Sequence, residues 1–357
     1  MCIRTRIGIS VLDFQRERSI LFPSFFWKKA QTMAAKVHTV TGAVSPDRLG
    51  KTLIHEHILF GFPGYQGDRT LGPFNHASAL QACLKVAESI KAHGVQTVVN
   101  ATPNECGRSP AFLREVAEQT GLNIICPTGY YFESTGGSAY FKFRSSLGDV
   151  EQEITDLFMT EVTVGIEQTD IKAGIFKLAS SRGRITDYEQ KFFRAAAKVH
   201  KATGVPILTH TTEGTMAPEQ ARLLISQGAN PQKILISHMG SCLNIEYHLE
   251  TLAEGVSISF DQWGIEELHN IPAENARIEL LLELLAKGYI NQIMLSNDSV
   301  WHWLGRPLNP DEYHRKLIAN WQTTYLFEGI LPLLKHRGVT KKEIETILID
   351  NPRQFFS

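Results

Sequence analysis

The sequence predicts an α/β fold, a single (β/α)8 TIM barrel, and three observations lead to that prediction. Short apolar runs rich in β-branched residues recur from residue 50 onward, at 52–54, 95–99, 123–126, 173–178, 205–209, 233–237, 255–260 and 292–295. Amphipathic stretches with helical spacing separate these runs, for example SALQACLKVAESIKAH and DYEQKFFRAAAKVHKAT. Continuous apolar runs are typical of strands buried on both faces. Eight such strands, each followed by a helix, match a parallel barrel.

Helix start and stop signals agree with this order. Ser109-Pro110 offers an N-cap followed by proline at the first helical position. Two pairs have capping-box spacing, Thr186 with Glu189 and Thr340 with Glu343. Several glycines stand between a helical stretch and the next strand, where a left-handed C-cap belongs: Gly94, Gly121, Gly204, Gly228 and Gly255. A nucleotide-binding doubly wound sheet is disfavoured, because neither GxGxxG after a first strand nor GxxxxGK[ST] occurs.

Composition excludes several other classes. The chain has 357 residues, with 36 basic and 37 acidic side chains and a net charge of -1. Such a balance gives nucleic-acid binding little electrostatic basis. No apolar run approaches the length of a membrane span. The five cysteines are scattered without a CxxC pair, which indicates a reducing, cytoplasmic location rather than a disulfide framework.

The domain prediction is an N-terminal leader over residues 1–33, followed by one barrel over 34–357. The leader carries four arginines and only short, interrupted apolar stretches. A secretory signal would need a continuous apolar region and a small-residue cleavage site, so we expect a loose arm or a misassigned start instead.

Polar side chains gather where the predicted strands end, which is where barrel enzymes carry their chemistry. His55 and His57 follow the first run and, being two residues apart, point to one face of a strand. The other four are Lys177 in the fourth run, His210 and His238 at the ends of the fifth and sixth, and Asp298 after the eighth. One strand-end histidine is more often a hydrogen-bonded core residue. Six such residues at one predicted face favour a metal site, since imidazole and carboxylate suit zinc, manganese, cobalt or iron.

These residues and their surroundings resemble the phosphotriesterase family of the amidohydrolase superfamily, including its lactonase branch. The resemblance is carried by the His-x-His pair and, in order, by AGIFKLAS, GVPILTHT, KILISHMG, LSNDS and NPRQFFS, from about residue 37 to the C-terminus. It implies two divalent transition metal ions, zinc first. One metal would be held by His55, His57 and Asp298, and the other by His210 and His238. Lys177, carboxylated on N6, would bridge them.

The implied chemistry is hydrolysis. An ammonium group has no lone pair, so Lys177 can serve as a ligand only if it is neutral or modified. Two cations sharing a water lower its pKa from 15.7 towards about 7, which supplies a metal-bridging hydroxide. The resemblance makes Lys177 and Asp298 catalytic, with Asp298 accepting the proton of the nucleophile. We expect a hydrolase of carboxylic esters or lactones, with promiscuous hydrolysis of organophosphate triesters.

A small-molecule substrate would be bound by aromatic residues that follow the strands. The predicted substrate-binding residues are Tyr130, Tyr131, Trp263, Trp301 and His302. If these residues rim the mouth, they form an apolar pocket. The alternative is that half or more of the loop aromatics pack the loops or a homodimer contact, and the resemblance implies a homodimer.

Two residues depart from the family pattern. Asp261 is kept and is expected to support the metal ligands from behind. Ser241 and Gln262 stand where triesterases have an aspartate and a histidine that relay a proton, and where lactonases tend to have an arginine at the second position. The departure argues against a full triesterase relay, and against a classic organophosphate or a typical acyl-homoserine lactone as the substrate. Within the enzyme class, the nearest alternatives to ester or lactone hydrolysis are hydrolysis of N-acyl amides and of phosphate esters.

Two alternatives use the barrel differently. Lys177 would be the Schiff-base lysine of an aldolase if its pKa were lowered by burial, but the histidines would then have no purpose. A non-catalytic barrel that binds a small molecule would be marked by a lost metal ligand, and none is lost.

Overall fold

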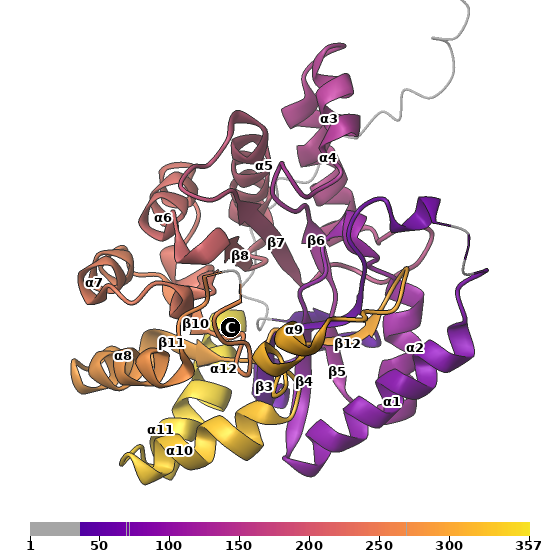
Figure 1. Ribbon diagram of the computed structural model, residues 1–357. Helices are drawn as coiled ribbons and strands as arrows, with labels where there is room; N and C mark the ends of the chain where they lie inside the picture. Colours follow the sequence, from indigo (N-terminus) through magenta and orange to yellow (C-terminus); the bar gives the residue numbers. More distant parts are fainter. Residues whose placement is uncertain (1–35, 69, 71, 269) are drawn as a thin grey trace, which may run out of the picture. The chain divides into compact units, whose positions relative to one another are not determined.

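Parallel strands occupy the centre of the fold, and helices surround them (Figure 1). The computed structural model describes residues 36–68, 70, 72–268 and 270–357. Residues Ala35–Ser357 form one compact unit. The predicted leader lies outside the described residues, so its boundary and role stay predictions.

The strands and helices follow one another largely in the predicted alternation. The strands are β1 (Val37–Thr39), β2 (Gly42–Val44), β3 (Lys51–Phe60), β4 (Val95–Asn100), β5 (Asn123–Ile125), β6 (Pro127–Gly129), β7 (Ile175–Ser180), β8 (Ile207–Thr211), β9 (Ile234–Ser237), β10 (Ser257–Phe260), β11 (Ile293–Leu295) and β12 (Val300–Trp303). The helices are α1 (His76–Ala92), α2 (Pro110–Thr120), α3 (Ser138–Ser145), α4 (Val150–Thr163), α5 (Asp187–Thr203), α6 (Ala217–Ser226), α7 (Ile245–Ala253), α8 (Glu274–Ala286), α9 (Glu312–Leu317), α10 (Leu331–His336), α11 (Lys341–Glu345) and α12 (Asn351–Phe356).

The strands close into a barrel, which confirms the predicted (β/α)8 fold. One sheet has the order β11-β10-β9-β8-β7-β6 and the other β12-β3-β4-β5. Cys126 alone separates β5 from β6. On the other side the segment after β11 pairs with β3, because the Asp298 amide donates to the His55 carbonyl at 3.0 Å and the His57 amide donates to the Ser299 carbonyl at 2.9 Å. Strand β12 extends this closing segment and was not predicted.

An apolar layer fills the barrel below the polar residues. Seven strands contribute one or two side chains each to it: Ile54, Val99, Ala101, Ile125, Ile175, Leu208, Leu235 and Met294. Val37 and the last aromatic residues, Phe355 and Phe356, pack against the same layer. The outer faces of the strands join a second cluster with the helices. The layer gives the site a rigid apolar base.

Strand β3 changes face along its length, and this change sets the orientation of the histidines. Its pairing with β4 shifts register between Leu53 and Glu56. Ile54 belongs to the interior layer, whereas Ile58 packs outward against the helices. Bulges of this kind re-aim side chains and are common beside active sites. The register shift therefore lets Ile54, His55 and His57 serve the interior while Glu56 faces the closing segment.

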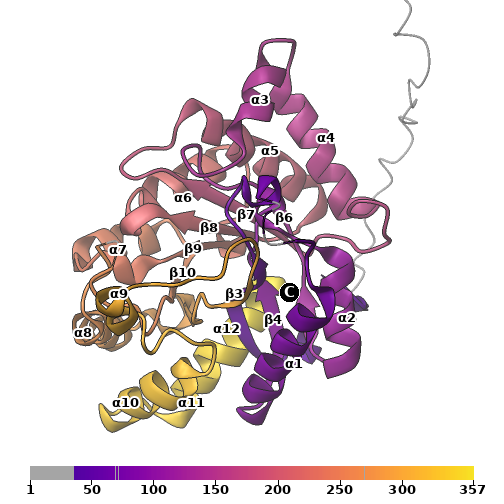
Figure 2. The same ribbon diagram turned by 45° about the vertical axis from the view of Figure 1, so that its right-hand side comes forward.

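The predicted caps are present. Thr186 with Glu189 and Thr340 with Glu343 form complete capping boxes. Ser109 precedes α2 with Pro110 at its first position, although the Ser109 side chain makes no cap hydrogen bond. The five predicted stop glycines have φ between 71° and 92°. Figure 2 shows α3 and α4 at the top of the view and α1, α10 and α11 at the bottom. In the part of the chain that the structure describes, no helix is long and apolar enough to cross a membrane.

Candidate active site

The six predicted residues converge at one end of the barrel. His55 and His57 lie on β3, Lys177 on β7 and His210 on β8, while His238 directly follows β9 and Asp298 follows β11. All six line one cavity. His238 and Asp298 have positive φ values of 65° and 55°, which turn the chain sharply at the strand ends. Non-glycine residues adopt this conformation rarely, so surrounding contacts must hold it.

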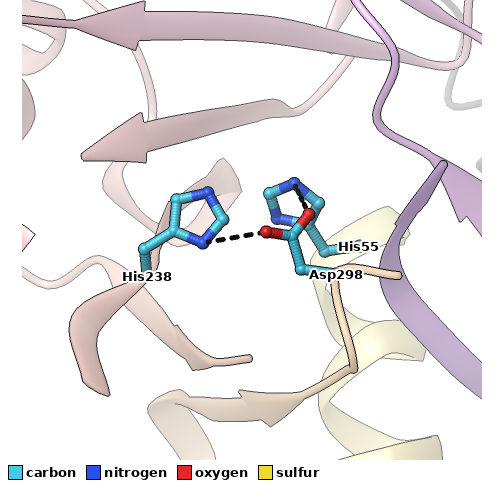
Figure 3. A group of neighbouring side chains, drawn as sticks. All are labelled: His55, His238 and Asp298. Carbon is cyan, nitrogen blue, oxygen red and sulfur yellow. Dashed lines mark ion pairs between the residues drawn. The ribbon is translucent and has the colours of Figure 1, made fainter. Parts of the chain in front are cut away.

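Asp298 lies between the imidazoles (Figure 3). Its Oδ1 is 3.1 Å from His57 Nε2 and 3.4 Å from His55 Nε2. Its Oδ2 is 3.7 Å from His238 Nδ1. One ligand atom each from His55, His238 and Asp298 fall within 4.8 Å of one another, a spacing that can hold a metal ion. Lys177 Nζ lies 2.9 Å from His55 Nε2, and the His210 and His238 ring centroids are 4.5 Å apart.

Hydrogen bonds orient three of the imidazoles and determine where each carries its proton. Thr102 already donates to a carbonyl, so its hydroxyl accepts from His57 Nδ1 at 3.0 Å. Thr212 likewise donates to a carbonyl and accepts from His210 Nε2 at 3.2 Å. The Asp261 carboxylate accepts from His238 Nδ1 at 2.6 Å. Each ring therefore keeps one nitrogen lone pair free, the arrangement that metal-binding histidines use.

Burial keeps these rings neutral. It lowers the pKa of His55 and His210 well below 6.5, and the nearby Lys177 ammonium acts in the same direction. Burial also lowers the pKa of His57, although Asp298 opposes the shift. At Asp298 burial raises the pKa, but His238 and His57 outweigh it and the net shift is downward, so the group is a carboxylate. Neutral imidazoles and a carboxylate form a donor set for a cation.

Lys177 is a buried lysine. Burial lowers its pKa to about 8, while Asp298 and Asp261 partly oppose the shift. A substantial neutral fraction is thus available near neutral pH, which an exposed lysine does not have.

These observations fit a metal centre. His55 Nδ1 is buried and has no hydrogen-bond partner, and the nearest carboxylate oxygen, Asp261 Oδ2, is 3.6 Å away. A buried polar atom without a partner is costly, which indicates that another group completes the site.

The cavity above this centre is large and mainly apolar. Its volume is about 710 Å³, within the range of small-molecule sites. The apolar walls include Phe60, Phe62, Tyr131, Phe132, Ile265, Leu268, Ile271, Val300, Trp303, Leu308, Ile318 and Trp321. Among the described residues that line it, Lys177 is the sole lysine and there is no arginine. Helix α9 lies in front of the strands in Figure 1. His314 of this helix and residues on either side of it, including Leu308 and Ile318, line the cavity.

Four of the five predicted substrate-binding residues lie outside this lining, which corrects the prediction; Tyr131 is part of it. Tyr130 packs among Phe141, Phe158 and Phe192. Trp263 is fully buried, with the Arg277 guanidinium 4.9 Å above its ring. Trp301 belongs to the outer core, and the His302 ring faces Phe74 at 6.1 Å. Position after a strand therefore did not determine which face of the chain each side chain would take.

Two further aromatic residues that follow the same predicted strands, Phe132 and Trp303, do line the pocket. Phe132 stacks on His210 with centroids 5.5 Å apart. Trp303 contacts Phe60, Phe62 and Trp321, with centroids between 5.5 and 6.4 Å. Phe60 and Phe62 come shortly after the His-x-His pair, so the strand-end rule could have found them. Trp321 comes from a distant loop, and its Nε1 donates to the Asp298 carbonyl at 3.0 Å.

Ser241 and Gln262 form a short hydrogen-bonded chain to the centre. The Ser241 hydroxyl donates to Gln262 Oε1 at 3.3 Å, and Gln262 Nε2 donates to Asp298 Oδ2 at 3.2 Å. Neither side chain titrates near neutral pH, so the chain orients Asp298 without providing an acid–base relay.

Glu105 holds the loop that carries Tyr131 and Phe132. Its Oε1 accepts from the Tyr131 amide at 2.7 Å. Burial raises the pKa of Glu105 from 4.5 to about 7, against the hydrogen bond from Tyr131. The folded protein therefore binds this proton more tightly than the unfolded chain does.

Linkage gives the expected pH dependence. As pH rises from about 4.5 to about 7, the unfolded chain loses the Glu105 proton first, so this group's contribution to the free energy of unfolding falls across that window and is constant above it. Glu105→Gln is neutral at every pH and lacks this decline. Urea unfolding of both proteins from pH 4.5 to 8 measures the difference. Parallel stability curves would contradict the prediction.

The model of the phosphotriesterase family matches residues 35–356. The chain belongs to the phosphotriesterase family. It is 34% identical to an aryldialkylphosphatase of Saccharolobus solfataricus over 313 residues, which cover 87% of this chain and 95% of the relative. It is 28% identical to an N-acetyltaurine hydrolase of Xenopus tropicalis over 361 residues, covering 91% and 99%.

A solved structure agrees with the fold. The organophosphorus hydrolase from Deinococcus radiodurans is 51% identical, has a TM-score of 0.90, and is matched over 92% of this chain and 98% of its own. Membership of this family confirms the predicted resemblance, the barrel and the class of enzyme: the chain is a metal-dependent hydrolase. The aldolase and the non-catalytic alternatives are set aside by this result.

Trp303 tests the pocket wall. We expect Trp303→Ala to raise KM for an apolar ester by about tenfold, or ~1.4 kcal/mol, because an aromatic contact with the substrate is lost. The kcat should change little, since Trp303 touches none of the converging histidines in the ring contacts of the described residues. His302→Ala is the matched control, because its ring faces Phe74 outside the cavity. Equal KM values for the two variants would contradict this wall.

Proposed function

We propose that this phosphotriesterase-family hydrolase cleaves neutral carboxylic esters or lactones that carry an apolar group, with organophosphate triesters as secondary substrates. The observation that carries the proposal is the mainly apolar cavity of about 710 Å³ directly above a cluster of buried histidines, a lysine and a carboxylate. Neutral esters need no counter-charge in the pocket, and the walls offer apolar and aromatic contact.

The proposed metal ligands are the six converging residues. His55, His57 and Asp298 would hold one divalent cation, and His210 and His238 the other, with zinc the first choice and manganese, cobalt or iron as alternatives. The free nitrogen of each oriented ring supports this assignment. Asp261 would support the second ion by holding His238 in its tautomer. Bound cations would polarise the scissile carbonyl or phosphoryl oxygen and lower the pKa of water.

Lys177 would bridge the two ions as a carbamate. Its neutral amine adds to the carbon of CO2 and releases one proton, so an N–C bond forms and the side chain gains a carboxylate of charge -1. The lowered pKa of about 8 supports the first step, because only the neutral amine has a lone pair. The two new oxygens would give the lysine the ligand character that an ammonium lacks.

Asp298 would accept the proton of the attacking water on a carboxylate oxygen. Its lowered pKa keeps it ionised, and the distance of 3.1 Å between its Oδ1 and His57 Nε2 supports its assignment as a ligand. Gln262 would hold Oδ2 by a neutral hydrogen bond, so the proton would leave Asp298 through the pocket rather than along the Ser241–Gln262 chain. Phe132, stacked on His210, would limit the entry of water from that side.

An anionic amide fits this pocket less well. N-acetyltaurine, which names one group of relatives, carries a sulfonate. The described lining offers no arginine and no lysine besides Lys177, which lies in the centre itself. A buried anion without a partner is costly, so N-acyl amides with a negative charge, and charged phosphate esters, rank below neutral esters.

A substrate panel tests the proposal. Lactones with short and long alkyl chains, aryl esters, aryl phosphotriesters, N-acyltaurines and aryl phosphomonoesters would be compared by kcat/KM with the metal-loaded protein. We expect neutral esters or lactones to rank first and kcat/KM to rise with alkyl length. A preference for N-acyltaurine or for phosphomonoesters would overturn the proposal.

A homodimer in the cytoplasm completes the proposal. Three exposed apolar side chains, Tyr140, Phe143 and Leu147, lie on or directly after α3 and would suit a subunit contact (Figure 2). Among the described residues, four free thiols, at Cys83, Cys106, Cys126 and Cys242, suit a reducing compartment. Light scattering of the full chain tests the dimer.

A further inference from the structure

The residues between and around the proposed ligands are not themselves proposed to bind a metal. Glu56 lies between His55 and His57, and Ser296, Asn297 and Ser299 surround Asp298. Both groups are buried: the exposed fractions of Glu56, Ser296 and Asn297 are 0% and that of Ser299 is 2%. A buried carboxylate is retained at low cost only if its oxygens are satisfied.

Glu56 meets this condition through the segment that carries Asp298. Its Oε1 accepts from the Ser296 hydroxyl at 2.7 Å and from the Asn297 amide at 2.8 Å. Its Oε2 accepts from the Ser299 amide at 3.0 Å and from the Ser299 hydroxyl at 2.6 Å. Within the described part of the chain these are four hydrogen bonds from a single stretch of four residues.

The backbone amides of Asn297 and Ser299, the residues on either side of Asp298, are therefore bound to one carboxylate. The Asp298 amide itself donates to the His55 carbonyl at 3.0 Å, one residue before Glu56. Thr323 also binds both Asn297 and Ser299. Its hydroxyl lies 2.5 Å from the Ser299 hydroxyl, and its carbonyl accepts from the Asn297 side-chain amide at 2.7 Å. The strained φ of 55° at Asp298 is thus enforced from both sides.

We propose that Glu56 is a positioning residue for hydrolysis: its carboxylate fixes the Ser296–Ser299 turn so that Asp298 reaches the imidazoles that β3 presents. Because successive side chains of a strand point to opposite faces, Glu56 turns towards this segment while His55 and His57 face the cavity. The triplet of His55, Glu56 and His57 would thereby supply two metal ligands directly. Through Glu56 it would also position a third ligand, Asp298, which lies near the other end of the barrel sequence. The inference rests on the proposed role of Asp298.

Glu56→Gln tests the clamp with little change in volume. A glutamine has one acceptor oxygen and one NH2 group, so it can accept at most two of the four hydrogen bonds and turns donors towards donors. We expect faster amide hydrogen exchange in a peptide spanning residues 293–303. We also expect loss of about one of two metal equivalents on dialysis, and a fall in kcat of about 10- to 100-fold with KM within about twofold.

Two sets of variants control for a general loss of stability. Glu161→Gln removes another buried carboxylate, which pairs with Arg108 at 2.6 and 2.8 Å and makes no hydrogen bond to the turn among the described contacts. Ser296→Ala and Ser299→Ala each remove one hydroxyl donor to Glu56 and keep the two backbone amides that bind it, so they should show smaller effects in the same direction. Ser299→Ala is the cleaner of the two, because the Ser296 hydroxyl also accepts from the His55 amide at 3.0 Å, whereas the second contact of the Ser299 hydroxyl is with Thr323. Combined with Glu56→Gln, Ser299→Ala should add little, because its bond to Glu56 is already lost.

These measurements distinguish a failure of the inference about Glu56 from a failure of the proposed function. Faster exchange at the turn together with selective metal loss in Glu56→Gln, but not in Glu161→Gln, supports the clamp. Equal effects of Glu56→Gln and Glu161→Gln, or an unchanged kcat with both metals retained, overturn it. If Glu56→Gln does not fold, the serine variants decide by the same measurements. A wild-type protein that binds no transition metal would refute the proposed function, while the exchange comparison would still decide whether Glu56 holds the turn.

Discussion

Removing divalent metals is expected to reduce ester hydrolysis by at least about 10³-fold, since polarisation by a metal supplies several kcal/mol of transition-state stabilisation. Burial keeps the His55 imidazole neutral, and its Nδ1 has no hydrogen-bond partner. A bound metal would therefore be the group that polarises the substrate. Dialysis against a chelator at neutral pH, followed by kcat/KM on the best substrate of the panel, measures the loss. Zinc, manganese or cobalt should restore activity up to two equivalents per chain.

The metals should also stabilise the fold. A ligand that binds only the native state adds about 2.7 kcal/mol when its concentration is 100 times its Kd. Since the ligands come from both sides of the barrel, on β3, β7 and β8 and after β9 and β11, we expect a higher Tm on metal addition. Full activity in the metal-free protein, checked by elemental analysis, would refute the metal-dependent centre.

Replacing Lys177 is expected to have an effect of similar size. Lys177→Ala removes the proposed bridge, so both metals should bind more weakly and kcat/KM should fall by about 10³-fold or more. Lys177→Arg separates two roles that a lysine could have, a fixed cation and a carbamate. The guanidinium stays charged and cannot form a carbamate. If Lys177 acted as a cation, arginine would retain part of the activity; as a carbamate, it would retain none.

The surface variant Lys198→Ala is the control, because its ammonium bonds only to Gln152 among the described contacts. Density for a carboxylate on Lys177 in a metal-loaded crystal would establish the bridge directly. An unmodified Lys177 in a fully active, metal-loaded enzyme would contradict it. Borohydride trapping with a carbonyl compound checks the Schiff-base role and should yield no adduct.

Much of this fold could be predicted because its signals are local. The apolar runs, the two capping boxes and the stop glycines each depend on neighbouring residues, and all of them appear in the structure. The third run is broken at Cys126 between β5 and β6, and β3 runs six residues further than predicted, to Phe60. Continued pairing with the closing segment explains that extension, and pairing across the chain is not visible in a local pattern.

The convergence of the six site residues also followed from one rule, that strand ends of a barrel meet at one mouth. The residues that form the pocket wall could not be predicted from this rule. Trp301 and Trp303 are two residues apart, yet only Trp303 lines the cavity, and Trp263 is buried beneath the Arg277 guanidinium. Packing against side chains from other loops decides such cases. The bonds of Glu56 span about 240 positions of sequence, so no spacing within a motif could have indicated them.

The floor of the barrel has a consequence for engineering. Phe355 and Phe356 close the interior layer, and Lys233 donates to the Phe355 carbonyl at 2.9 Å. The last residues of the chain therefore act as a stopper at the end opposite the catalytic mouth. In a library of variants, the loops at the mouth can be randomised to shift substrate selectivity. Phe355 and Phe356 should be kept unaltered, so that the barrel tolerates those changes.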